Sequence, residues 1–136
     1  MNNQSNDIED KFKIIISVGD ESGIGPEIIL KALFSKEIPQ NLDFIIVGSK
    51  NNLENTYKNL KSLGVKNIVD PNNYQIHDIK IPFEINKPKK SNGNASFLYL
   101  KKAIELVQKY TNAALVTGPI CKKSWSLAGH NYSGQT

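Results

Sequence analysis

The strongest constraint on the fold is a nearly continuous apolar run, FKIIISV, at residues 12–18. A strand that is buried on both faces of a parallel sheet has this pattern, because neither of its faces meets water. The glycine-rich segment GDESGIG at 19–25 follows directly, and Pro26 then opens an apolar-periodic segment. Proline suits the first position of a helix, where its missing N–H costs nothing. The sequence therefore predicts a strand, a tight loop and a helix in direct succession.

The same alternation continues along the chain. The further predicted elements are strands at 43–47, 65–69, 79–85 and 113–117 and helices at 51–63, 95–110 and 120–127. Alternating strands and helices are typical of an α/β fold with a mostly parallel sheet and flanking helices. We expect residues 1–11, rich in Asn and Asp, to form a disordered leader, and residues 12–136 to form one α/β portion.

Composition excludes several classes of protein. The formal charge of +4 comes entirely from 17 scattered lysines, without one arginine, which indicates a solvated surface and not a nucleic-acid interface. No apolar window reaches the length of a membrane span, and the polar start lacks a signal peptide, so we expect a cytoplasmic protein without a membrane partner. The single cysteine, Cys121, excludes an internal disulfide and a thiolate metal cluster.

Two loops are candidates for the functional site. Residues 19–25 and 117–122 each follow a predicted strand, and ligands of parallel α/β sheets bind outside the carboxyl ends of the strands. If the two strands are parallel, both loops lie at the same edge of the sheet. The spacing G-x-x-x-G-x-G is neither the dinucleotide fingerprint nor a phosphate-binding Walker loop. A glycine turn before a closely packed helix is therefore the preferred interpretation of the first loop.

Individual side chains in these regions have a structural and a functional interpretation. Lys122 could attract a phosphate as a point charge, or be a solvated lysine on the first turn of a helix. Cys121 is predicted to be a small buried residue in preference to a nucleophile. His77 and His130 show no metal-ligand spacing, and Trp125 is interpreted as packing.

The two loops carry a family resemblance. Residues 19–27 match the signature G-[DE]-x-[AS]-G-I-G-P-E. Residues 117–122 and 128–136 match nearly throughout the signature T-[GA]-P-[IV]-x-K followed by A-G-x-x-[FY]-x-G-H-T-E. These are similar to the signatures of the 4-hydroxythreonine-4-phosphate dehydrogenase family, and residues 93–107 resemble that family's glycine-led helix. The first signature also resembles that of isocitrate and isopropylmalate dehydrogenases, whereas the second separates the two groups.

The resemblance implies an isocitrate/isopropylmalate dehydrogenase-like architecture and an oxidoreductase of pyridoxal phosphate (vitamin B6) biosynthesis. Its reaction would be the NAD- or NADP-dependent oxidation of 4-phosphooxy-L-threonine to 2-amino-3-oxo-4-phosphooxybutanoate, which decarboxylates to 3-amino-2-oxopropyl phosphate. A divalent metal ion would polarise the substrate oxygens. A homodimer and a small phosphorylated amino-acid substrate are implied as well.

Residue by residue, the resemblance assigns substrate binding to three positions. The family's histidine–threonine pair falls on Gln135 and Thr136, so Gln135 is a departure that keeps hydrogen bonding but loses an imidazole. Lys122 matches the motif lysine, for which we hypothesise attraction of the substrate phosphate. The family's metal-binding histidines and most of its cofactor site lie beyond the equivalent of Thr136. We therefore expect residues 12–136 to be the N-terminal portion of a longer dehydrogenase, with an incomplete sheet, no metal ligand and no activity alone.

Two other functions stay open at this point. A β-decarboxylating hydroxyacid dehydrogenase is supported by residues 19–27 but not by residues 117–136. A non-catalytic, truncated binding module is favoured by the lack of metal ligands in this chain.

Overall fold

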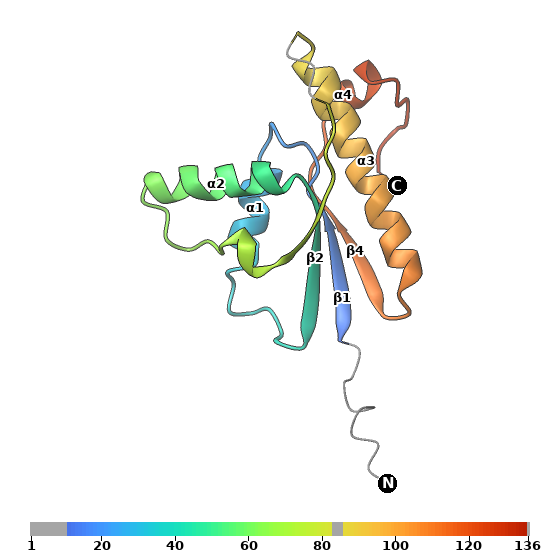
Figure 1. Ribbon diagram of the computed structural model, residues 1–136. Coiled ribbons are helices and arrows are strands. Elements are labelled where there is room, and N and C mark those ends of the chain that lie inside the picture. Colours follow the sequence, from blue (N-terminus) through green and yellow to red (C-terminus); the bar gives the residue numbers. More distant parts are fainter. Residues whose placement is uncertain (1–10, 83–85, 136) are drawn as a thin grey trace.

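The computed structural model describes residues 11–82 and 86–135. Its four strands form one parallel sheet in the order β3-β2-β1-β4 (Figure 1). The strands are β1 (Phe12–Ser17), β2 (Leu42–Gly48), β3 (Gln75–Asp78) and β4 (Ala113–Thr117). In the register of the sheet, Ser17 lies opposite Val47 on one side and Thr117 on the other. The α/β fold with a parallel sheet is confirmed.

The described residues also form four α-helices, of which the first three flank the sheet: α1 (Gly25–Ala32), α2 (Lys50–Ser62), α3 (Pro88–Lys109) and α4 (Lys122–Leu127). The strand order reverses between β1 and β4, so right-handed crossovers place α1 and α2 on one face and α3 on the other. Figure 1 shows this arrangement, with α1 and α2 together on one side of the strands and α3 opposite them. None of the helices in the described part of the chain is long and apolar enough to cross a membrane.

The core explains why the middle of β1 and the middle of β2 consist of apolar residues. Ile15 and Ile46, in the middle of these strands, are fully buried because helices cover both faces of the sheet. Leu30 of α1 and Leu53 of α2 are buried with them, as is Ala103 of α3. The two central strands therefore form a rigid platform, and the loops at their carboxyl ends start from fixed positions.

Helix α4 packs closely on α3 through a glycine and a tryptophan. A Cβ atom at Gly93 would lie only 2.0 Å from the carbonyl oxygen of Ser124, so only glycine allows this approach. Trp125 is 1% exposed, and its Nε1 donates to Ser96 Oγ at 2.8 Å. Ser96 Oγ in turn donates to the Gly93 carbonyl at 3.1 Å. The interpretation of Trp125 as a packing residue is confirmed.

Three predictions of secondary structure are wrong. Residues 65–69 form no strand; there the Val69 amide donates to the Leu30 carbonyl at 3.1 Å. The edge strand is β3, before the predicted range 79–85, of which residues 79–82 lie outside any strand and 83–85 outside the described residues. Helix α3 begins at Pro88 and not at 95, because its first turns are polar and lack the apolar spacing that marks a helix. Residues 1–10 of the expected leader also lie outside the described part of the chain.

Candidate functional site

The loops that follow β1 and β4 contact each other at the carboxyl edge of the sheet. The Gly118 amide donates to the Ser17 carbonyl at 2.7 Å, and the Asp20 amide donates to the Pro119 carbonyl at 2.9 Å. The sequence prediction that these two loops share one edge is therefore confirmed. This edge lies at the reversal of strand order, where open α/β sheets place their ligands.

Glycine is required at the contact itself. Gly19 has a φ of +81°, and a Cβ atom there would lie 2.3 Å from the Pro119 carbonyl oxygen. At Gly118, a Cβ atom would lie 2.2 Å from the Val18 carbonyl oxygen. The Asp20 carboxylate closes the first loop by accepting from both the amide and the hydroxyl of Ser22, at 2.9 and 2.7 Å. Glycine at positions 19 and 118 thus allows the backbones of the two loops to pack closely.

Gln135 lies against the second loop. Its Nε2 donates to the Gly118 carbonyl at 3.2 Å, which fixes the orientation of the amide because a carbonyl can only accept. The opposite atom, Gln135 Oε1, is buried and has no hydrogen-bond partner among the described residues. A buried acceptor without a partner is costly, so this oxygen is suited to accept a hydrogen bond from a bound molecule.

Lys122, the second candidate, lies on the first turn of α4. A Cβ atom at Gly134 would lie 3.8 Å from Lys122 Cε, so the lysine stem runs past the residue next to Gln135. The structure therefore brings Lys122 and Gln135 to the same end of β4. The third candidate, Thr136, lies outside the described residues.

An aromatic stack attaches the segment that carries Gln135 to helix α3. The rings of His130 and Phe97 lie 3.7 Å apart and nearly parallel, and Tyr132 stacks on Phe97 at 5.7 Å. His130 Nε2 lies 3.0 Å from Asn94 Oδ1. Burial lowers the pKa of His130 below its ordinary value of 6.5. His130 thus acts as a packing residue in its neutral form.

Two other kinds of site were considered in the sequence, a metal site with histidine ligands and a cysteine nucleophile. His77 lies in β3, and no group of three histidine, cysteine or acidic side chains could hold a metal ion among the residues described. Cys121 is partly exposed in front of α4, so the prediction that it is buried is wrong. Hydrogen bonding with Ser124, first through its side chain and then through its backbone, lowers the pKa of the Cys121 thiol.

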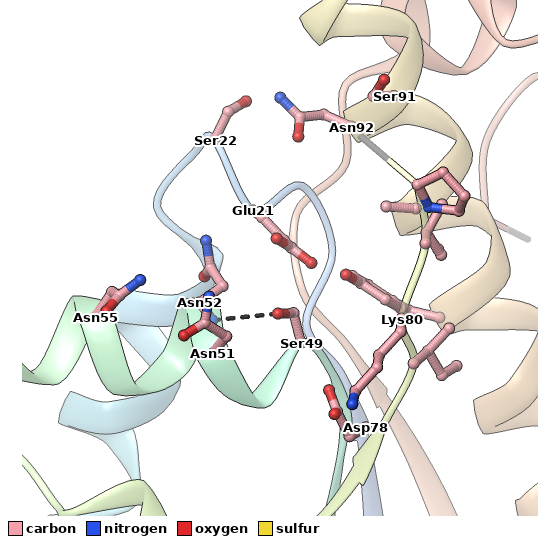
Figure 2. Close-up of a pocket in the computed structure, with 15 residues that line it drawn as sticks. Glu21, Ser22, Ser49, Asn51, Asn52, Asn55, Asp78, Lys80, Ser91 and Asn92 are labelled. Carbon is pink, nitrogen blue, oxygen red and sulfur yellow. Dashed lines mark hydrogen bonds between the residues drawn. The ribbon is translucent and has the colours of Figure 1, made fainter. Parts of the chain in front are cut away.

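A pocket of about 770 Å³ lies beside the first loop, and the sequence analysis did not predict it (Figure 2). Its polar wall comes from the loop after β1, the first turns of α2, the segment after β3 and the start of α3. Side chains that line it include Glu21, Ser22, Ser49, Asn52, Asp78 and Lys80. These residues are far apart in the sequence and form no motif, so only the fold could bring them together.

Glu21 is the most perturbed acid of this pocket. Its Oε1 is buried without a hydrogen-bond partner among the described residues, and Asn52 Oδ1 is in the same situation. Burial, followed by the negative charges of Asp20 and Asp78, raises the pKa of Glu21 from 4.5 to about 7. Figure 2 shows Glu21 between Asn52 and Lys80 in this view.

Comparison with known proteins identifies relatives of this chain. Residues 40–136 match the family model described as "Pyridoxal phosphate biosynthetic protein PdxA". A 4-hydroxythreonine-4-phosphate dehydrogenase from Nostoc sp. is 38% identical over 143 residues, which cover 98% of this chain and 40% of the relative. A protein from Fusobacterium nucleatum, provisionally named D-threonate 4-phosphate dehydrogenase, is 34% identical over 93% of this chain and 42% of its own length.

Solved structures agree on the fold. The crystal structure of a 4-hydroxythreonine-4-phosphate dehydrogenase from Burkholderia phymatum superposes with a TM-score of 0.69 at 24% identity. That superposition covers 90% of this chain and 41% of the solved chain. The chain therefore spans about 40% of the length of the relatives that it matches.

Proposed function

Since the chain belongs to the family of the pyridoxal phosphate biosynthetic protein PdxA, we propose that it forms the substrate-binding part of a 4-hydroxythreonine-4-phosphate dehydrogenase. The proposed reaction is the NAD- or NADP-dependent oxidation of 4-phosphooxy-L-threonine, followed by loss of carbon dioxide. We propose that the whole enzyme works as a cytoplasmic homodimer, as the family resemblance implies.

One observation carries this proposal: Gln135 is held by the second loop and has an acceptor without a partner. Gln135 Nε2 donates to the Gly118 carbonyl, while Gln135 Oε1 is buried without a partner in the described part of the chain. The loop itself is fixed against the first loop through the hydrogen bond from the Asp20 amide to the Pro119 carbonyl. An acceptor that is held in place before the ligand arrives costs little ordering free energy on binding.

We assign different tasks to the two described site residues. Gln135 Oε1 would accept a hydrogen bond from the amino or hydroxyl group of the substrate. Lys122, whose stem passes Gly134, would attract the substrate phosphate as a point charge. Because glutamine is neutral at every ordinary pH, its hydrogen bond would not titrate as a histidine's would.

The family resemblance also implies a nicotinamide cofactor, which accepts the hydride, and a divalent metal ion. Residues 11–82 and 86–135 do not fit a metal site, since no group of three ligating side chains comes together in them. We propose that the metal ligands lie outside these residues. The described residues would bind and orient the substrate.

Isothermal titration of the chain with 4-phosphooxy-L-threonine tests the proposal directly, because binding can be measured where turnover is not expected. Lys122→Ala should weaken binding by about tenfold, the loss expected for one charge-assisted contact. Gln135→Ala should weaken it by about fivefold, since it removes a neutral hydrogen bond. Lys36→Ala is the matched control, because Lys36 is an exposed lysine in the segment after α1.

Further ligands separate this activity from its neighbours. D-threonate 4-phosphate replaces the amino group with a hydroxyl, so a preference for one of the two ligands identifies the natural substrate. Isocitrate, the substrate type of the β-decarboxylating relatives, should not bind. Equal affinity for 4-phosphooxy-L-threonine in the wild type and in Lys122→Ala would remove Lys122 from the site. Affinity no higher than that for inorganic phosphate would contradict the proposal as a whole.

A further inference from the structure

The pocket beside Glu21 is not explained by the proposed substrate site. Lys122 and Gln135 are not among its lining residues, which come from the first loop, α2, β3 with the segment after it, and α3. With a volume of about 770 Å³, it is large enough for a small metabolite. What this pocket can bind therefore has to be argued from its own side chains.

The wall of the pocket offers both donors and acceptors. The carboxamides are those of Asn51, Asn52, Asn55 and Asn92, and hydroxyl groups come from Ser22 and Ser49. A carboxamide carries an acceptor oxygen and two N–H donors, and a hydroxyl can act in both ways. Such a wall suits a ligand whose groups both donate and accept hydrogen bonds, as hydroxyl groups do.

Two acceptors in this wall lack a partner among the described residues. Glu21 Oε1 and Asn52 Oδ1 are both buried without a hydrogen bond. Neighbouring polar groups are already engaged, since Asp78 Oδ1 accepts from the Lys50 amide at 2.9 Å and Ser49 Oγ accepts from the Asn52 amide at 3.2 Å. A ligand that donates two hydrogen bonds would remove the cost of both unpaired oxygens.

Charge narrows the choice of ligand. Glu21 and Asp78 in the wall, with Asp20 next to Glu21, repel an anion such as a phosphate. Lys80, an exposed residue, is the cation among the lining residues. An apolar ligand would leave the two unpaired acceptors without water and without a partner, which is unfavourable.

We propose that this pocket binds a vicinal diol, such as that of a free sugar or of the ribose of a nucleoside, with the Glu21 carboxylate accepting from its hydroxyls. The two oxygens of a carboxylate match two hydroxyls on adjacent carbons, the chemistry by which dinucleotide-binding folds hold a ribose. Ala95 and the buried Tyr99 give the pocket an apolar wall for the carbon face of a sugar. An ammonium group fits less well, because it offers no acceptor to the carboxamide N–H groups.

Calorimetric titration of the full chain tests this inference with paired probes. Adenosine should bind with a dissociation constant of about 1 mM, an affinity expected of an open polar pocket. 2′-Deoxyadenosine, which lacks the diol, should bind about tenfold more weakly. D-ribose shows whether the diol belongs to a free sugar or to a nucleoside. Equal affinity for D-ribose and adenosine indicates a sugar site, and weaker binding of D-ribose indicates a nucleoside site.

Variants assign the binding to Glu21. Glu21→Gln keeps the size of the side chain but replaces an acceptor oxygen with a donor N–H group. It should weaken the binding of adenosine by about tenfold. Asn55→Ala, at an exposed residue of the wall, should weaken it by about threefold without disturbing the core. Glu37→Gln is the matched control, since Glu37 is exposed and lies outside the pocket.

The pH dependence gives an independent check. Binding should become tighter as the pH rises through about 7, because Glu21 then carries the charge that accepts from both hydroxyls. Asp20, Asp78 and Lys80 are the other charged groups that face Glu21. Equal affinity for adenosine and 2′-deoxyadenosine would overturn the inference. Saturable binding of methylammonium in place of D-ribose, or no saturation by any diol, would overturn it as well.

Discussion

Gly19 packs directly on the Pro119 carbonyl oxygen, which a Cβ atom at Gly19 would approach to 2.3 Å. The same oxygen accepts the Asp20 amide at 2.9 Å. Two loops that are about a hundred positions apart in the printed sequence are thereby joined into one unit. The position of Gln135, which donates to the Gly118 carbonyl of the second loop, therefore depends on the packing of the first loop.

Gly19→Ala should destabilise the protein by about 2–4 kcal/mol, because it combines a clash with backbone and a left-handed φ of +81°. Gly64→Ala separates these two causes. Gly64 has a φ of +83° but nothing within 4 Å of its added Cβ atom, so its cost should stay at about 1 kcal/mol. Urea denaturation of both variants gives the comparison. Equal losses of stability would show that the close contact of the loops contributes nothing.

Ser96→Ala should cost about 1–3 kcal/mol of unfolding free energy, because it leaves Trp125 Nε1 buried without its acceptor. The expected change is also visible in the fluorescence of Trp125, the single tryptophan of the chain. Ser126→Ala is the control, since Ser126 is exposed and its hydroxyl donates to Asn131 at a longer 3.3 Å. A loss at position 96 no larger than at position 126 would contradict the role given to this hydrogen bond.

Glu21→Gln should make the protein more stable at pH 8 and leave it unchanged near pH 4.5. The pKa of Glu21 is raised from 4.5 to about 7, so the folded state binds more protons than the unfolded state between these values. The stability of the wild type therefore falls as the pH rises through this window. The gain in the variant at pH 8 should be about 1–2 kcal/mol after allowance for screening by water.

Thermal unfolding at several pH values between 4.5 and 8 measures this effect. Glu37→Gln, at an exposed residue outside the pocket, serves again as the control. If the stability of Glu21→Gln depends on pH in the same way as that of the wild type, the Glu21 carboxyl is not perturbed in the folded protein.

His130→Gln should change the pH dependence in the opposite direction. Burial lowers the pKa of His130 below 6.5, so the unfolded state binds the proton first as the pH falls. The contribution of His130 to stability is therefore present above pH 6.5 and is lost as the pH falls through its lower, folded value. Measured in the Glu21→Gln background, the loss of stability at acid pH (the acid loss) should be reduced by His130→Gln. Retention of the full acid loss in the double variant would refute this assignment.

The sequence predicted the elements that hold the site, because these elements are the most apolar. β1 and β4 are largely apolar, and the prediction that their loops share one edge followed from parallel pairing alone. Edge strand β3 was misplaced because Gln75–Asp78 is short and polar, with a single aliphatic residue. The start of α3 was missed because its first turns are lysines and small polar residues.

The pocket could not be predicted in the same way. Glu21, Asn52 and Asp78 belong to three different segments, and no spacing in the sequence relates them. Burial of the Glu21 carboxyl depends on how the loop after β1 lies over the ends of the sheet, which is a property of the folded chain. By contrast, Gln135 and Lys122 were predicted as site residues through the family resemblance, and the structure brings both to the end of β4.

The most direct test of the account is a map of backbone amide shifts in the isotopically labelled chain during titration with 4-phosphooxy-L-threonine. If the two loops form one substrate site, the shifted signals should be those of Asp20, Gly118, Lys122 and Gln135, and Gly19→Ala should weaken all of them together. Shifts confined to α2 and the pocket beside Glu21, or no saturable shift at all, would contradict the proposal that the contact between these loops forms the substrate site.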